Sequence, residues 1–290
     1  MNPSSRLGTC IAIALALSGP ALAHGIVGDR FFPATITIDD PFAADELALP
    51  TVTILNHETD YDLDYAKSIC PGFALSIGAG YANASPPGEP HATGFEDVSL
   101  TPVAELFRSA PHEAIVSAGV IWEIGGTGRK SLADRLSTYT PEILFGKGFG
   151  DIPDSLALLR PFAVTGQIGV KIPGESANSK AVEWGGALEY SLLYLENNVR
   201  DVGLPNIAAR LTPIVEFSLE TPTEKSGGPT TGTLNPGLIW SGQTIQLAAE
   251  AMIPVNGASG RTVGAIAQLH FYVDDIFPHS LGRPIFGSTR

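Results

Sequence analysis

Long segments of this chain alternate, residue by residue, between apolar and small or polar side chains. In one such segment Leu75, Ile77 and Ala79 fall on one side, whereas Ser76 and Gly78 fall on the other. Successive side chains of a β-strand point to opposite faces, so this period of two indicates strands with one apolar face. An amphipathic helix would need apolar spacings of three and four, which these segments lack. The sequence therefore predicts an all-β protein.

Twelve segments share this pattern, and the connections between them alternate broadly between short and long. They are 50–58, 61–69, 73–82, 98–107, 113–124, 138–147, 160–171, 182–195, 211–221, 233–241, 243–253 and 263–273. Outer-membrane barrels have even strand numbers, strands of about ten residues, and short turns at one end with longer loops at the other. We predict a single antiparallel transmembrane β-barrel of about 12 strands. Only the connection 196–210 is long for a periplasmic turn.

A soluble, secreted β-sandwich would show the same alternation, because its buried face is apolar and its wet face polar. Two properties favour the barrel. Only 16% of residues are charged, whereas about a quarter is usual in soluble domains. The polar face is also small and poor in lysine, and the chain contains 32 glycines. A strand whose outer face contacts lipid needs no charged surface, so the barrel explains this composition better.

The first 23 residues have the features of a signal peptide. Arg6 precedes an apolar stretch, residues 11–18, and the small-residue site Ala21-Leu22-Ala23 predicts cleavage before His24. Because this signal peptide would export the chain and a barrel follows it, we predict that the protein lies in the bacterial outer membrane. We expect four parts, listed here by residue number: 1–23, the signal peptide; 24–49, an N-terminal periplasmic or plug segment; 50–273, the barrel; and 274–290, a C-terminal tail.

Charge and cysteine content restrict the partners. The net charge is −13, and loss of Arg6 with the signal peptide makes it about −14. No basic cluster is present, so a nucleic-acid partner is disfavoured. Outer-membrane lipid and a small-molecule solute are the expected partners, and the sequence does not specify an oligomeric state. Only Cys70 remains after cleavage, so no internal disulfide can form.

The polar positions of the predicted strands point into the lumen. The candidates for lumen-facing residues are Glu105, Glu113, Glu123, Lys171, Glu183, Glu189, Glu216, Glu250, Gln268 and His270, joined by Asp62, Asp64, Gln167, Glu220 and Gln246. An acidic lumen favours cations over anions. The alternative is that these residues fill a narrow barrel as a hydrogen-bonded interior, because twelve strands lie between filled and open barrels.

Aromatic residues near the segment ends are candidates for the interfacial girdles of a membrane barrel. They are Tyr81, Trp122, Tyr194, Trp240 and Phe271. Motifs for chemistry are missing: the sequence has no G-x-S-x-G, P-loop or H-E-x-x-H, and its six histidines show no tight metal-ligand spacing. We therefore expect no enzymatic activity, no cofactor and no metal site.

Four segments resemble one family of proteobacterial outer-membrane proteins. They are Asp60–Tyr65, Phe73–Tyr81, Gly94–Leu100 and Leu234–Trp240. The family is labelled putative MetA-pathway of phenol degradation, and the resemblance covers residues 50–273. It implies a small, porin-like barrel that acts as a transporter. Many outer-membrane barrels end on a terminal aromatic residue, whereas this chain continues past Phe271, so either its assembly signal is internal or its last strand lies elsewhere.

Together these features lead to one leading expectation of function, a passive channel or transporter for small molecules, with hydrophobic or aromatic solutes as candidates. The alternative from another class is a closed structural or surface-binding barrel without transport.

Overall fold

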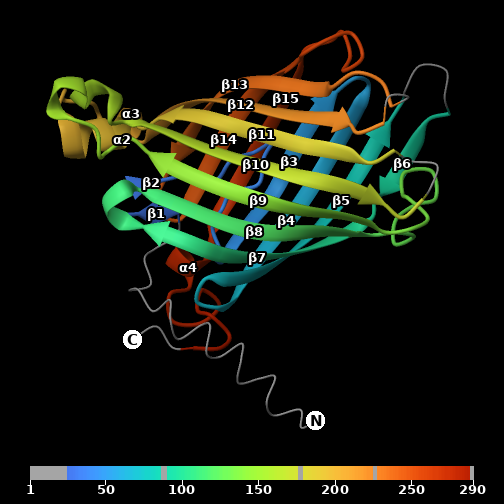
Figure 1. Cartoon of the computed structure of the whole chain (residues 1–290), viewed down its shortest axis with the longest axis horizontal. Helices are drawn as coiled ribbons and strands as arrows, with labels where there is room; N and C mark the ends of the chain where they lie inside the picture. Colours follow the sequence, from blue (N-terminus) through green and yellow to red (C-terminus); the bar gives the residue numbers. More distant parts are fainter. Residues whose placement is uncertain (1–24, 86–89, 176–178, 225–226, 288–290) are drawn as a thin grey trace.

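The computed structural model describes residues 25–85, 90–175, 179–224 and 227–287 (Figure 1). The expected signal peptide lies outside these residues. The strands are β1 (Ile26–Val27), β2 (Arg30–Phe31), β3 (Glu46–Leu55), β4 (Glu58–Cys70), β5 (Phe73–Ala84), β6 (Ala92–Phe95), β7 (Val98–Ser109), β8 (Ala114–Ile124), β9 (Thr138–Gly148), β10 (Phe162–Pro173), β11 (Ala181–Tyr190), β12 (Leu211–Pro222), β13 (Thr231–Ser241), β14 (Ile245–Pro254) and β15 (Gly264–Tyr272).

The wall of the molecule is a closed barrel. Strands β3–β5 and β7–β15 each pair antiparallel with their neighbours, and β15 pairs with β3 to close the ring of twelve. The short strand β6 extends the β7 side of the wall, since it pairs with the last residues of β5, whereas β7 pairs with the first. The predicted all-β fold, one antiparallel barrel of twelve strands, is confirmed.

Side chains alternate strictly between the two faces of the wall along strand β9. Ile143 and Phe145 point outward and are 43% and 40% exposed, whereas Glu142 and Leu144 point inward and are 5% and 0% exposed. Outward glycines are covered by a neighbouring ring: Phe145 lies opposite Gly166 on β10, and a Cβ at Gly166 would touch that ring at 2.5 Å. The outside is thus apolar, and the polar residues are enclosed.

Aromatic pairs join neighbouring strands near both ends of the wall. Trp122 and Tyr139 are partners across β8 and β9, and their rings stack with centroids 5.9 Å apart. Phe162 and Tyr190 are partners across β10 and β11 at the opposite end, 4.7 Å apart and edge to face. Such belts at two levels are typical of a barrel whose ends meet the two membrane–water interfaces.

The two ends of the barrel differ. At the end that we call the terminal end, residues 25–45 enter and β15 finishes; the opposite end is the loop end (Figure 1). The loop end carries the connections 56–57, 85–97, 125–137, 174–180, 223–230 and 255–263. The shortest is a two-residue turn in which Asn56 and His57 both have positive φ, 50° and 71°. That combination defines the hairpin turn whose twist matches the strands it joins.

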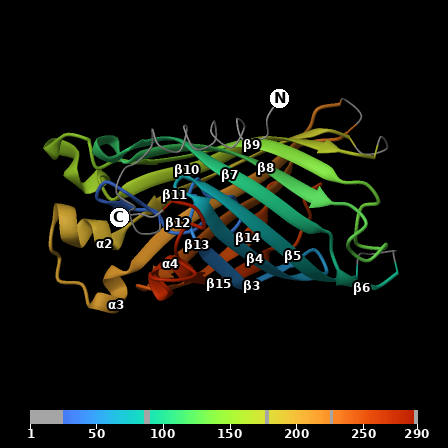
Figure 2. The same ribbon diagram turned by 90° about the horizontal axis from the view of Figure 1, so that it is seen from below.

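Helical segments occupy the connections of the terminal end, where α2 and α3 project beyond the wall (Figure 2). They are η1 (Ala110–His112), η2 (Asp154–Leu159), α2 (Leu192–Tyr194), η3 (Leu195–Val199), α3 (Asn206–Ala209) and α4 (Val273–Ile276). Among the described residues, no helix has the length and apolar character needed to cross a membrane.

The predicted strand over 182–195 was too long. Strand β11 ends at Tyr190, because the Ser191 side chain accepts a hydrogen bond from the Tyr194 backbone N–H at 3.1 Å and so caps α2. An N-terminal cap of this kind begins a helix whatever the apolar pattern beyond it. Tyr194 is therefore buried at the terminal end and not part of the outer aromatic belt, which corrects the sequence-based expectation.

Residues 32–45, which we call the plug, run inside the barrel. Phe32 and Phe42 pack with inward-facing Ile115 in one buried cluster. Ile38 packs with Ile214 and other wall residues in a second. The apolar core of the protein therefore lies in the lumen, between the plug and the wall.

After β15 the chain folds back under the wall. Ile285 and Phe286 donate their backbone N–H groups to the carbonyls of Ser68 and Ile69, at 3.2 and 2.8 Å. The Lys67 ammonium adds hydrogen bonds to two tail carbonyls, those of Leu281 and Arg283. The tail thus lies along the terminal end of β4, and the last strand of the barrel is internal to the chain.

Candidate functional site

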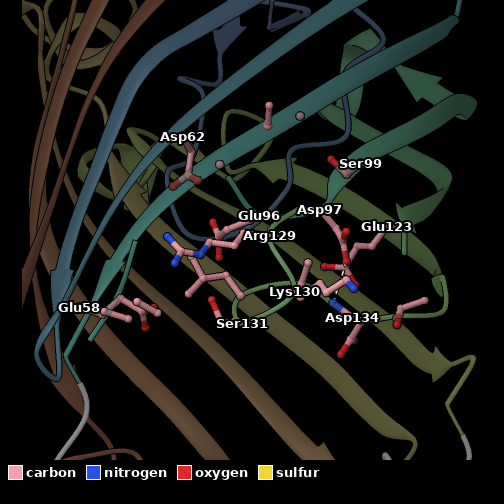
Figure 3. Close-up of a pocket in the computed structure, with 18 of the residues that line it drawn as sticks. Glu58, Asp62, Glu96, Asp97, Ser99, Glu123, Arg129, Lys130, Ser131 and Asp134 are labelled. Carbon is pink, nitrogen blue, oxygen red and sulfur yellow. Dashed lines mark hydrogen bonds between the residues drawn. The ribbon is translucent and has the colours of Figure 1, made fainter. Parts of the chain in front are cut away.

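The loop-end half of the lumen contains an open cavity of about 910 Å³, which we call the outer cavity (Figure 3). Its charged lining is mainly acidic: Glu58, Asp62, Asp64, Glu96, Asp97, Glu123 and Asp134, against Arg129 and Lys130. These residues come from β4, β8 and the loops 85–97 and 125–137, so the cavity exists only because the barrel and its loops enclose it together.

Two glycines of β5 make room for the carboxylates. A Cβ on Gly80 would collide with the Glu96 carboxylate and lie 2.8 Å from Asp62 Oδ1. A Cβ on Gly78 would lie 2.6 Å from Asp64 Oδ1. The small residues on the polar face of this strand therefore provide the space that the acidic side chains of neighbouring strands occupy.

Asp97 organises the loop that forms the cavity rim. Its Oδ1 accepts hydrogen bonds from the backbone N–H groups of Thr127 at 3.0 Å and Gly128 at 2.9 Å, and its Oδ2 accepts one from Asp134 at 2.8 Å. Three backbone donors on one carboxylate hold residues 127–134 in place. Asp97 is thus a loop-shaping residue, and the other carboxylates set the charge that a solute meets.

Glu96 lies in the loop between β6 and β7, beside those carboxylates. Burial raises the pKa of Glu96 above its usual range, and the neighbouring Asp62 and Glu58 raise it further. The second of these causes reflects acidic groups close together, because a neighbouring carboxylate disfavours a second negative charge. A cation entering the outer cavity would relieve that repulsion.

The outer cavity continues inward. A second cavity of about 430 Å³, the inner cavity, shares Asp62 and Asp64 with it and ends on Ile36 and Thr37 of the plug. A third, of about 210 Å³, opens on the terminal side and is lined by Phe31, Ser241, Tyr272 and others. The plug therefore separates a wide acidic vestibule from a small chamber at the opposite end.

Wall side chains hold the plug through its backbone. Gln246 Nε2 donates to the Ala34 carbonyl at 2.7 Å, and Gln246 Oε1 accepts from the Ala34 N–H at 3.2 Å. The Glu216 carboxylate accepts from the N–H groups of Ile36 and Thr37 at 2.9 and 2.8 Å, and from the Thr37 hydroxyl at 2.5 Å. These bonds satisfy backbone groups that have no strand partner.

The return arm of the plug is held in the same way. Gln167 Oε1 accepts from the Asp39 N–H at 2.5 Å. Ser117 donates its hydroxyl to the Pro41 carbonyl at 2.5 Å, and Glu105 accepts from the Ala43 N–H at 3.3 Å. These contacts come from β7, β8 and β10, so both arms of the plug are fixed by side chains that the strand periodicity points inward.

An arginine anchors the plug at the terminal end. Arg30 is fully buried, and its Nε lies 3.3 Å from Glu113 Oε2. Its two terminal nitrogens donate to the carbonyls of Pro161, at 2.9 Å, and Arg160. The guanidinium also lies 3.8 Å from the centre of the Tyr194 ring, and the Tyr194 hydroxyl donates to Glu113 Oε1 at 2.9 Å. Arg30, which lies just before the plug, thus contacts three connections of the terminal end.

The ten residues selected from the sequence lie in several different settings. Glu105 and Glu216 bind the plug backbone, as described above. Glu113 lies in the turn before β8, in the left-handed conformation, and pairs with Arg30. The predicted strand 113–124 placed Glu113 on the wall, but the observed strand β8 begins one residue later, at Ala114. Glu123 lines the outer cavity.

The remaining six make contacts within the wall or lie buried. Lys171 forms ion pairs with Glu183 at 3.2 Å and with Glu220 at 3.3 Å, so its charge is compensated. His270 lies 2.9 Å from Glu46, and Gln268 donates to the Thr51 hydroxyl at 3.0 Å. Glu189 and Glu250 are both buried.

Sequence reasoning missed several residues of the lumen, among them Arg30, Asp39, Glu96 and Glu142. Glu142 alternates in step with Thr140 on a predicted strand, so periodicity alone could have identified it. Arg30 and Asp39 belong to an aperiodic segment, and no local pattern indicates their contacts. Among the described residues, no group of three or more His, Cys, Asp or Glu side chains could hold a metal ion.

Comparisons with known proteins place this fold. No family model and no curated protein matches the sequence, so the resemblance to the phenol-degradation family stays a prediction. Among solved structures, the KdgM porin matches with a TM-score of 0.51 at 11% identity, covering 78% of this chain and 98% of the porin. The NanC porin matches with a TM-score of 0.51 at 10% identity, covering 79% and 99%. A KdgM porin in complex with disordered oligogalacturonate matches with a TM-score of 0.50 at 12% identity, covering 78% and 98%. This chain therefore has the barrel fold of outer-membrane porins.

Proposed function

We propose that this protein is a passive outer-membrane channel for small cationic solutes, narrowed by its own plug. One observation carries the proposal: an acid-lined cavity of about 910 Å³ opens at the loop end and continues through an inner cavity to the plug. The apolar outer wall supports a position in the membrane, and the periplasmic side is then the terminal end, where the chain enters and leaves the barrel.

The charge of the lumen supports cations over other solutes. Fixed carboxylates create a negative potential that concentrates cations and repels anions. The Lys171 ammonium is neutralised by Glu183 and Glu220, so it does not offset that potential. An anionic chain such as the oligogalacturonate held by one KdgM porin would be repelled here. The polar lining also favours cations over the hydrophobic or aromatic solutes that the family resemblance implies.

Ion selectivity tests the proposal directly. The purified, folded protein is inserted into planar bilayers between unequal KCl solutions, and the reversal potential is measured. We expect a cation-selective reversal potential that weakens in the double variant Asp62→Asn/Glu96→Gln. The matched control is Asp151→Asn, which removes a carboxylate from a terminal-end turn where it pairs with Lys147, away from the cavity. Anion selectivity, or an equal loss in the control, would contradict the proposal.

The plug favours a second candidate, a closed barrel without transport. Residues 32–45 lie inside the barrel and are bonded to side chains of five wall strands. A closed barrel predicts no current from the intact protein and clear current from a variant whose residues 33–44 are replaced by a glycine–serine linker. A narrow channel predicts a small current from the intact protein and a larger one from the same variant.

A further inference from the structure

Three polar residues lie side by side on the inner face of neighbouring strands beneath the plug. Glu216 on β12 is the direct partner of Asn235 on β13, and Glu250 on β14 is the partner of Gly237, two residues further along β13. Their exposed fractions are 0%, 0% and 3%. A Cβ on Gly237 would collide with the Glu250 side chain, so that side chain lies over β13.

The side-chain polar atoms of Asn235 and Glu250 lack hydrogen-bond partners, which is unusual for buried groups. Neither Asn235 Nδ2 nor Oδ1, and neither carboxylate oxygen of Glu250, has a hydrogen-bond partner within the described part of the chain. The Glu216 and Glu250 side chains lie close enough to interact. Glu216 accepts hydrogen bonds from the plug, whereas no group in the described part of the chain donates to Glu250. Buried polar groups are costly to leave unpaired, and a bound species is one way to pair them.

No basic side chain supplies the missing positive charge. Arg30 is engaged by Glu113 and by the Pro161 and Arg160 carbonyls, and Lys171 by Glu183 and Glu220. Over residues 25–287, excepting the undescribed gaps, no ion pair reaches Glu216 or Glu250.

The inner cavity lies next to the three residues. Ser218, Thr233 and Met252 line that cavity, and each is two positions from Glu216, Asn235 or Glu250 on the same face of its strand. The inner cavity shares Asp62 and Asp64 with the outer cavity, which opens at the loop end. The inner cavity therefore comes within two strand positions of each member of the trio.

We propose that Glu216, Asn235 and Glu250 form a binding site for a small hard divalent cation, of the calcium type, between the plug and the wall. Two carboxylates balance a charge of +2, and the Asn235 carbonyl oxygen adds a third ligand of the kind that calcium prefers, with water supplying the rest. A set of two carboxylates and one amide is also consistent with the finding that no three acidic, His or Cys side chains form a metal site.

The site would couple the cation to the plug. Glu216 holds Ile36 and Thr37, so a cation that fixes the Glu216 carboxylate also stabilises the plug tip. The inference rests on the proposed function only in that the lumen admits cations; it does not depend on net transport. The competing occupant is a proton shared by the two carboxyl groups, which leaves no cation to bind.

Calorimetry at pH 7 tests the site. It uses the folded, full-length mature protein in detergent, from which bound metal has been removed with a chelator. We expect calcium chloride to give one saturable binding event and to raise the thermal unfolding midpoint. Glu250→Gln, which keeps the shape and removes the charge, weakens binding by about tenfold or more, because ligand charge sets calcium affinity. Glu224→Gln, on an exposed loop, is the matched control and leaves binding unchanged.

Asn235→Asp separates the cation from the shared proton. A third carboxylate tightens calcium binding if a cation occupies the site, and lowers stability equally with and without calcium if a proton does. The proposal is overturned by the second result, by the lack of a saturable event, or by equal affinity in Glu250→Gln and the unchanged protein. Bilayer currents are recorded separately. A protein that binds calcium but conducts no current contradicts the proposed channel function and leaves the proposed calcium site standing.

Discussion

Gln246 pairs with Ala34 as a neighbouring strand would, donating to its carbonyl at 2.7 Å and accepting from its N–H at 3.2 Å. The same device recurs along the plug, where single wall side chains replace the backbone of a sheet. The twelve wall strands therefore keep their own complete ladder. The plug is consequently a separable element, held by a small number of side chains that can be changed one at a time.

Gln246→Leu is expected to loosen the plug without opening the wall. The change leaves the buried N–H and C=O of Ala34 unpaired, and each such group costs about 1–3 kcal/mol. It also removes the acceptor of the Tyr272 hydroxyl, 2.8 Å away. We expect larger single-channel currents and a lower unfolding midpoint. Gln243→Leu, on the exposed turn before β14, is the control, and equal currents in the two variants would refute the assignment.

Arg30→Met is expected to destabilise the terminal end strongly. It leaves the Glu113 carboxylate buried without its charge partner, and breaking a buried pair from one side costs about 3–5 kcal/mol. Equilibrium unfolding in urea measures the loss. Adding Glu113→Gln should recover part of it, because the uncompensated charge is then gone. Arg135→Met removes an exposed ion pair with Glu175 and should change stability by at most about 0.5 kcal/mol.

Cation selectivity is expected to fall as the pH is lowered from 7 to 5. Asp39 stands at the plug tip and is accessible to luminal water, yet enclosure by the barrel raises its pKa to about 6, and Glu183 adds to the rise. The pKa of Glu96 is raised as well. A raised pKa means that the charge is present above it and lost below it, so the lumen becomes less negative in this range.

Reversal potentials at a fixed KCl gradient measure this change. Asp39→Asn should remove part of the pH dependence, because the amide does not titrate. A selectivity that stays constant from pH 7 to 5 and falls only near pH 4, the ordinary range of carboxyl groups, would contradict the role given to these two residues.

The wall could be predicted from the sequence. A plug was one of two alternatives predicted for residues 24–49, but its contacts could not be predicted. A lipid-facing strand must be apolar at every second position. The spacing of residues such as Ile143 and Phe145 along the chain therefore reveals the strand directly. The contacts of Ala34 and Arg30 are made with residues far away in sequence, and no local spacing encodes them. Where prediction failed on the wall, at Tyr194, a single capping side chain, Ser191, overrode the apolar pattern.

A charge on the outer face distinguishes a lipid-facing wall from a soluble surface. Ile143 on β9 and Leu136 in the preceding loop are both 43% exposed, so solvent exposure alone predicts the same effect for either. If the wall is embedded, Ile143→Arg places a charge in hydrocarbon and costs about 2–4 kcal/mol near the bilayer midplane. Leu136→Arg, beyond the strand ends, should cost at most about 1 kcal/mol. Folding of both variants into lipid vesicles, followed by urea unfolding, gives the two free energies. Equal values would mean that β9 does not face lipid.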